Sequence, residues 1–158
     1  MLEGKIDAYI SLPGTRCPAI EYQTKRPCNG LLFADYGVNI MGQGIAVNTD
    51  SLKAKPDAIK KFVQVSLKAW EYCKDHLDEC VTSLDKRREK PSTPPNVIAK
   101  IIKSMYDDLG FTPRTVGKPY GYMDPQDWQD TVNSAKKYLA LEVKSPETYY
   151  TNDLVPTK

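Results

Sequence analysis

The sequence predicts an α/β fold in which a few short strands are followed by about four helices. Short apolar runs bounded by turn residues fill the first 50 residues, a pattern typical of buried strands. From residue 51 onward, apolar residues recur at helical spacing in several longer stretches. With 158 residues and 41% hydrophobic content, the chain can bury a core of its own. We therefore expect a single domain over 1–158, strand-rich over 1–50 and helical over 51–158.

Three strands are expected in the first region. Residues 5–10 alternate weakly and end in β-favouring side chains, so they form the first strand. A short helix over 19–24 follows a Pro-Gly loop. The apolar runs 30–35 and 44–48 are then predicted as two buried strands, because turn residues bound both of them.

The clearest helix begins at Pro56, because proline suits the first helical position and Asp57 suits the positive end of the helix dipole. Its predicted buried face consists of residues spaced three and four apart: Ile59, Phe62, Val63, Ser66, Leu67, Trp70 and Cys73. A second, short helix is expected over 77–84.

Two further helices carry their own start signals. Asn96 is the expected N-cap of a helix that Gly110 ends. Asp124 is the expected N-cap of the last helix, with Pro125 at its first position. The tail over 145–158 is too irregular for a regular element, but its aromatic side chains can pack onto one.

The four cysteines are too few and too widely spaced to indicate a disulfide scaffold, and buried free thiols are the favoured interpretation. Cys73 and Cys80 would lie about 10 Å apart on one unbroken helix, which is too far for a disulfide. A helix break at Asp75 and His76 would allow the two to meet, and this alternative stays open. The single histidine, His76, has no second imidazole to share a metal with.

Charge and motifs exclude several function classes. A net charge of +2, from 22 basic and 20 acidic residues, gives no electrostatic footprint for a nucleic-acid partner. The N-terminus lacks the basic and continuous apolar regions of a secretory signal, so the chain as written is expected to stay where it is made. The sequence contains no nucleophile elbow, P-loop, zinc-protease motif or dinucleotide fingerprint. We therefore expect no enzyme, no catalytic residue, no metal and no cofactor.

Five stretches occur in an order that resembles a known family. They are GKIDAYI, LLFADYGVN, the segment 44–81, GYMDPQDWQDTV and YYTNDLVP. Together they resemble the C-terminal half of the ABC-transporter solute-binding proteins for thiamine pyrimidine precursors, sulfonates and nitrate. The resemblance implies part of a periplasmic-binding-protein type II lobe, with residues 1–50 at the hinge where such proteins hold their ligand.

The resemblance also implies a ligand-binding set made of Thr15, Arg16, Tyr36 and Asn39. Tyr36 would contact a ring and Asn39 would donate hydrogen bonds to polar ligand atoms. The alternative is that the stretch 35–39 only builds a turn, since Asp, Asn and Gly favour turns. Where the family has a Glu-Pro pair that faces the ligand, this chain has Arg16 and Cys17, and a guanidinium prefers anions.

The partners implied are a small-molecule ligand, either a pyrimidine precursor or a small anion, and an ABC transporter permease. A homodimer, or an N-terminal half supplied by another chain, would complete a two-lobed crevice. A self-associating remnant that binds nothing is the second interpretation, and an enzyme related to pyrimidine synthesis is the third. The family is extracytoplasmic, whereas this chain shows no export signal, so the localisation stays open.

Overall fold

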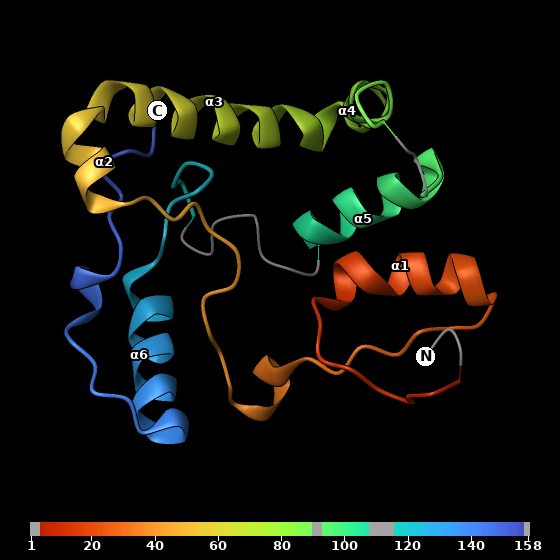
Figure 1. Ribbon diagram of the computed structural model, residues 1–158, viewed down its shortest axis with the longest axis horizontal. Coiled ribbons are helices and arrows are strands. Elements are labelled where there is room, and N and C mark those ends of the chain that lie inside the picture. The colour runs from red at the N-terminus through yellow and green to blue at the C-terminus, as the bar shows by residue number, and fades with distance from the viewer. Residues whose placement is uncertain (1–3, 90–92, 108–115, 157–158) are drawn as a thin grey trace. The chain divides into compact units, whose positions relative to one another are not determined.

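The computed structural model describes residues 4–89, 93–107 and 116–156, and the secondary structure in these ranges is helical (Figure 1). In chain order, the elements are α1 (Pro13–Thr24), the 3-10 helix η1 (Phe33–Tyr36), α2 (Thr49–Ala54), α3 (Pro56–Asp75), α4 (Leu77–Asp85), α5 (Pro95–Asp107), α6 (Pro125–Leu139) and the 3-10 helix η2 (Pro146–Thr148). None of the helices in the described ranges is both long and apolar enough to cross a membrane.

The predicted α/β class is wrong, because the described part of the chain forms no strand. Residues 5–10 and 44–48 are extended or bent without pairing, and the run 30–35 leads into η1. A strand is stable only when a neighbouring strand takes up its main-chain hydrogen bonds. These runs carry the apolar character of strands, but their larger side chains stay exposed, as for Ile10 and Ile45.

The chain divides into two compact units, each of which is built from two segments. The first unit comprises Met1–Leu32 and Tyr72–Phe111, and the second comprises Phe33–Glu71 and Thr112–Lys158. Most of α3 lies in the second unit, and its last turn, from Tyr72 onward, belongs to the first.

In the first unit, α5 contacts both α1 and α4. The buried apolar side chains of the first unit come from α4 and α5, and they are Val81, Val97, Ile98 and Tyr106. α5 begins at Pro95, so Asn96 lies inside its first turn and the predicted N-cap is wrong. Instead, the carbonyl of Pro94 accepts from the backbone N–H groups of Val97 and Ile98, at 3.0 and 3.1 Å. The predicted stop at Gly110 lies outside the described residues.

The first unit also contains two disulfides, so the prediction of free thiols is wrong. One joins Cys17 of α1 to Cys28, and the other joins Cys73 to Cys80 with Cα atoms 5.7 Å apart. The second pair meets because α3 ends at Asp75 and α4 starts at Leu77, which is the break left open as an alternative. His76 between them has a non-helical conformation, with φ −126° and ψ 47°.

In the second unit, the predicted starts of α3 and α6 are confirmed. α3 begins at Pro56, and Asp124 caps α6 by accepting from the backbone N–H of Gln126 at 2.9 Å. One member of the predicted buried face of α3 is misplaced, because Phe62 is 62% exposed whereas Val63 is buried. The spacing alone places a boundary residue such as Phe62 on either face of the helix.

The irregular tail of the second unit packs onto α6 through its aromatic side chains. The indole ring of Trp128 stacks with Tyr150 at a centroid distance of 5.2 Å and with Tyr149 at 6.4 Å. Asn152 forms two hydrogen bonds with the backbone of Met123, accepting at 2.9 Å and donating at 3.0 Å. Burial raises the pKa of the Tyr150 hydroxyl, and the nearby carboxylate of Glu147 adds to this shift.

Candidate functional site

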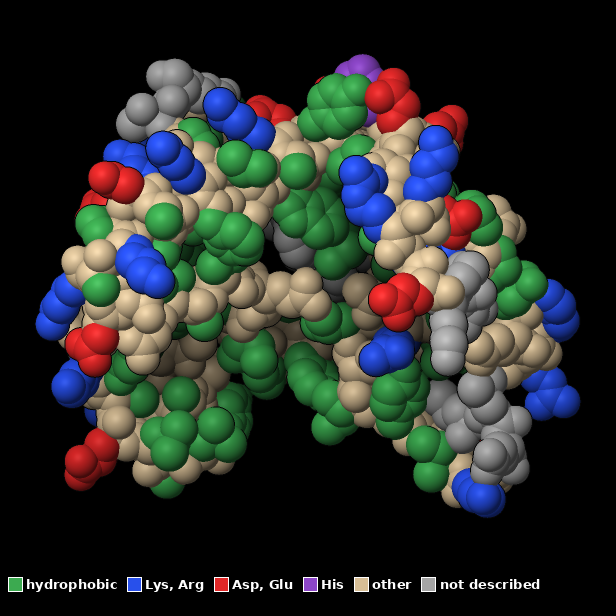
Figure 2. All heavy atoms as spheres, turned by 45° about the horizontal axis from the view of Figure 1, so that its top comes forward, with side chains coloured by type: hydrophobic (Ala, Val, Ile, Leu, Met, Phe, Trp, Pro, Cys, Tyr) green, Lys and Arg blue, Asp and Glu red, His purple; other side chains and the backbone are tan. Residues whose placement is uncertain are grey.

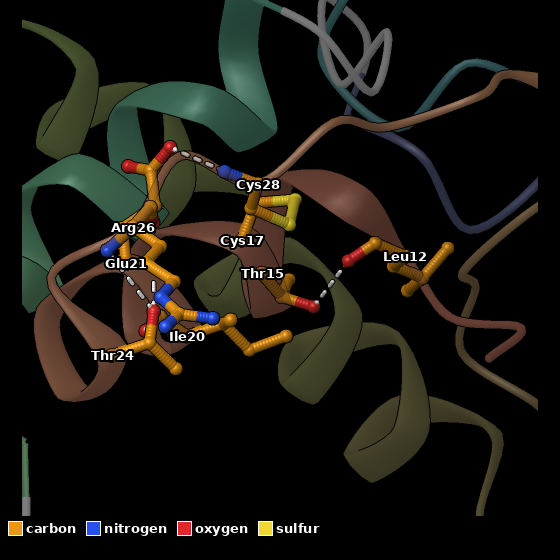
Figure 3. The surroundings of a disulfide bond; sticks show 8 residues. All are labelled: Leu12, Thr15, Cys17, Ile20, Glu21, Thr24, Arg26 and Cys28. Atoms are coloured by element: carbon orange, nitrogen blue, oxygen red, sulfur yellow. Dashed lines mark hydrogen bonds between the residues drawn. A yellow bond between two sulfur atoms is a disulfide. The ribbon is translucent and has the colours of Figure 1, made fainter. Parts of the chain in front are cut away.

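Two of the predicted ligand-binding residues lie in the first turn of α1, in the first unit. The hydroxyl of Thr15 donates to the carbonyl of Leu12 at 3.0 Å, as Figure 3 shows. The backbone N–H of Arg16 donates to the same carbonyl at 3.2 Å, and the residue is exposed. The Thr15 hydroxyl is therefore engaged in starting the helix, whereas the Arg16 guanidinium faces solvent.

The other two predicted residues, Tyr36 and Asn39, flank a tight turn in the second unit. Gly37 has a φ of +80°, which glycine adopts readily, and its N–H donates to Ala34 at 3.1 Å. The N–H of Val38 donates to Phe33 at 3.0 Å. The main chain thus builds this turn, and the side chains of Tyr36 and Asn39 are not needed for it. Tyr36 is 70% exposed.

Two hydrogen bonds fasten the segment after this turn to the first half of α6, and a third, within the helix, orients the Thr131 hydroxyl. The hydroxyl of Thr131 accepts from the backbone N–H of Met41 at 2.7 Å and donates to the carbonyl of Asp127 at 2.8 Å. The side-chain amide of Asn39 donates to the carboxylate of Asp127 at 3.5 Å, a long hydrogen bond. Asn39 is consequently held beside α6 and is half-buried.

A groove of about 310 Å³ runs between this turn and α6 within the second unit. Its lining residues are Gly37, Asn39, Asp130, Asn133, Ser134, Lys137 and Tyr138. The α6 members follow the i, i+3, i+4, i+7, i+8 spacing of one helix face. Of the four predicted ligand-binding residues, only Asn39 lines this groove.

The groove offers hydrogen-bonding groups of several kinds together with opposite charges. The carboxylate of Asp130 accepts from Gln126 at 2.9 Å, and the carbonyl of Asn133 accepts from Gln129 at 3.0 Å. The Asn133 amide NH₂ is therefore the group it can present to a ligand. The Lys137 ammonium lies 4.9 Å from the centroid of the Tyr138 ring. This set suits a small polar molecule.

Sequence reasoning missed the part of this groove that α6 contributes. A polar helix face is ordinarily solvated, and nothing in residues 130–138 distinguishes them from such a face. The signal appears only when the segment 37–41 is seen to pack against that face. In the described ranges, no three His, Cys, Asp or Glu side chains gather in a way that could hold a metal ion.

Comparison with known families gives one match. A family model described as NMT1/THI5 like matches residues 1–80, which include α1, the turn at Gly37 and α3. Searches of curated proteins and of solved structures found no match. The match covers half of the chain, so the chain belongs to the NMT1/THI5-like family of solute-binding proteins.

Proposed function

We propose that this protein binds a small polar solute and that the groove between the Gly37 turn and α6 contributes to the binding. The observation that carries the proposal is the placement of Asn39, which belongs to the family-matched stretch and lines a groove with charged and amide groups from α6. The family consists in general of binding proteins that take small-molecule ligands and associate with transporters. We therefore propose binding without a covalent step.

For the ligand, we propose a small anion in preference to a neutral pyrimidine precursor. The ammonium of Lys137 attracts negative charge, and the amide NH₂ groups at Asn39 and Asn133 can donate to anionic oxygens. The Arg16 guanidinium, which faces solvent in the first unit, also prefers anions. By analogy with the family, we propose an ABC transporter permease as the partner. The permease would receive the solute from this protein.

The test compares two adjacent lysines of α6. Lys137 lines the groove and Lys136 does not, so Lys136→Ala controls for the loss of one positive charge on the same helix. Nitrate, a small sulfonate and a phosphorylated aminopyrimidine serve as probes in isothermal titration calorimetry. We expect Lys137→Ala to weaken binding of the best probe by about 10-fold, the effect of losing one charge-assisted hydrogen bond. Equal affinities for the two variants would contradict the proposal.

Self-association is a second candidate function, supported by the exposed apolar side chains. On α3, Phe62 and Val65 are 62% and 67% exposed, and α6 ends with Leu139 at 67%. Hydrophobic side chains are visible at many places on the surface shown in Figure 2. Exposed apolar surface favours contact with another molecule. Native mass spectrometry at micromolar concentration tests this candidate: a dimer supports it, and a monomer that persists on concentration contradicts it.

A further inference from the structure

Helix α1 packs on α5 but contributes no fully buried apolar side chain to the first unit. Where the structure describes the first unit, the buried apolar side chains come from α4 and α5, and α1 supplies none of them. Its N-cap residue, Leu12, offers no side-chain cap, and Pro18 lies inside the helix, where it cannot donate a backbone hydrogen bond. A helix of this length is marginal in water by itself. α1 therefore depends on its attachment to the rest of the unit.

The Cys17–Cys28 disulfide is the main attachment between α1 and the segment that follows it (Figure 3). α1 ends at Thr24, and Lys25 has a left-handed conformation with φ 54°, after which the chain turns back. Besides the disulfide, the backbone N–H of Cys28 donates to the carboxylate of Glu21 at 3.2 Å. The backbone N–H of Arg26 also donates to the hydroxyl of Thr24 at 3.2 Å. Both hydrogen bonds are at least partly exposed to water, so they add little to the stability of the turn-back.

The Cys73–Cys80 disulfide differs because non-covalent contacts span the same corner. The hydroxyl of Tyr72 donates to the carboxylate of Glu79 at 2.7 Å. The rings of Tyr72 and His76 stack with centroids 4.1 Å apart. Directly after Cys80, the side chain of Val81 is buried, and α4 packs on α5. Reduction leaves these contacts in place, and the contact that is shielded from water is the packing of α4 on α5, next to the buried Val81.

We propose that the Cys17–Cys28 disulfide is a redox-sensitive latch that holds α1 and the segment 25–32 in the folded first unit, whereas opening Cys73–Cys80 leaves α4 in place. A dithiol reductant opens the latch by thiol–disulfide exchange: the sulfur–sulfur bond breaks, two thiols form on the protein, and the dithiol becomes a cyclic disulfide. Two electrons and two protons pass from the dithiol to the two cysteines. Whether α1 and the segment 25–32 stay folded therefore depends on the thiol redox state of the solution around the protein.

The rate of cleavage by trypsin measures how often each disulfide-closed loop opens, because the chain between each pair of cysteines contains one cleavable lysine. The bond after Lys25 lies between Cys17 and Cys28, and the bond after Lys74 lies between Cys73 and Cys80. Arg26 is followed by proline and resists cleavage. The bond after Lys137, in α6 of the second unit, reports whether the remainder of the chain stays folded. Cleavage at each bond is timed by mass spectrometry after full reduction of the quenched peptides.

Three proteins are compared: the unmodified chain with and without dithiothreitol, Cys17→Ser with Cys28→Ser, and Cys73→Ser with Cys80→Ser. We expect reduction or the first double variant to speed cleavage after Lys25 at least about 10-fold, because cleavage follows the population of the opened state. Cleavage after Lys74 in the second double variant is expected to rise less than about 3-fold, and cleavage after Lys137 is expected to stay unchanged in all samples.

Two results would contradict the proposal that the Cys17–Cys28 disulfide is a local latch. Unchanged cleavage after Lys25 on reduction would show that packing, not the disulfide, holds α1. A rise after Lys137 that parallels the rise after Lys25 would show that the cross-link supports the whole chain and is no local latch. Tryptophan fluorescence separates these cases independently, because Trp70 and Trp128 both belong to the second unit and are expected to keep their spectrum on reduction.

Discussion

Gly121 is a position at which an added Cβ atom would meet other atoms within 4 Å, and replacing it by alanine tests how the second unit is packed there. Its φ is +80°, and a Cβ atom there would collide with Cδ2 of Leu67 and lie 2.7 Å from its Cδ1. Both methyl groups of Leu67 would be too close, so the end of this half-buried side chain must shift. Gly117 is the matched control, because its φ is +83° and an added Cβ meets no atom within 4 Å.

The expected cost has two parts. The left-handed backbone costs a non-glycine residue about 1–2 kcal/mol, and both substitutions share this part. Overpacking against Leu67 adds about 1–3 kcal/mol to Gly121→Ala alone. The assay is urea unfolding followed by tryptophan fluorescence, which reports on the second unit because Trp70 and Trp128 both lie in it. If Gly121→Ala loses no more stability than Gly117→Ala, then Leu67 does not pack against Gly121 as described.

Three further outcomes are expected in the second unit. Asp124→Ala removes the N-cap bond of α6 and should cost about 1 kcal/mol in urea unfolding, whereas Asp124→Asn keeps an accepting oxygen and should cost less than half of that. Asn152→Leu removes both bonds to Met123, so hydrogen exchange of the Met123 amide should quicken; an unchanged rate would mean that the tail is held elsewhere. The raised pKa of Tyr150 favours its neutral form in the folded state, so its contribution is complete below its ordinary value of about 10 and is lost as pH rises through the folded value. Unfolding at pH 8 and at pH 10.5 should therefore differ more for the unmodified chain than for Tyr150→Phe.

The helices that were predicted well carry their own start signals. Pro56 begins α3, and Asp124 with Pro125 begins α6, because capping and the restricted φ of proline act within a few neighbouring residues. The short helix expected over 77–84 is confirmed as Leu77–Asp85. These features need no information from distant parts of the chain.

The features that were predicted wrongly depend on distant partners. A run such as 44–48 becomes a strand only if another strand pairs with it, and its composition does not show whether one does. Cys17 and Cys28 pair because the chain turns back at Lys25, a left-handed residue that sequence reasoning does not single out. The α6 side of the groove becomes a candidate site only through the contacts of Met41 and Asn39 with that helix.

The most direct test of solute binding at the groove is an NMR titration of the uniformly labelled chain with the tightest-binding anion found by calorimetry. We expect amide shifts confined to residues 37–41 and to the face of α6 over 130–138, with the largest changes at Asn39 and Asn133, and with clearly smaller shifts in the Lys137→Ala variant at the same sub-saturating anion concentration. Shifts that appear elsewhere in the chain, or that are the same size in Lys137→Ala, would show that this groove is not the binding site.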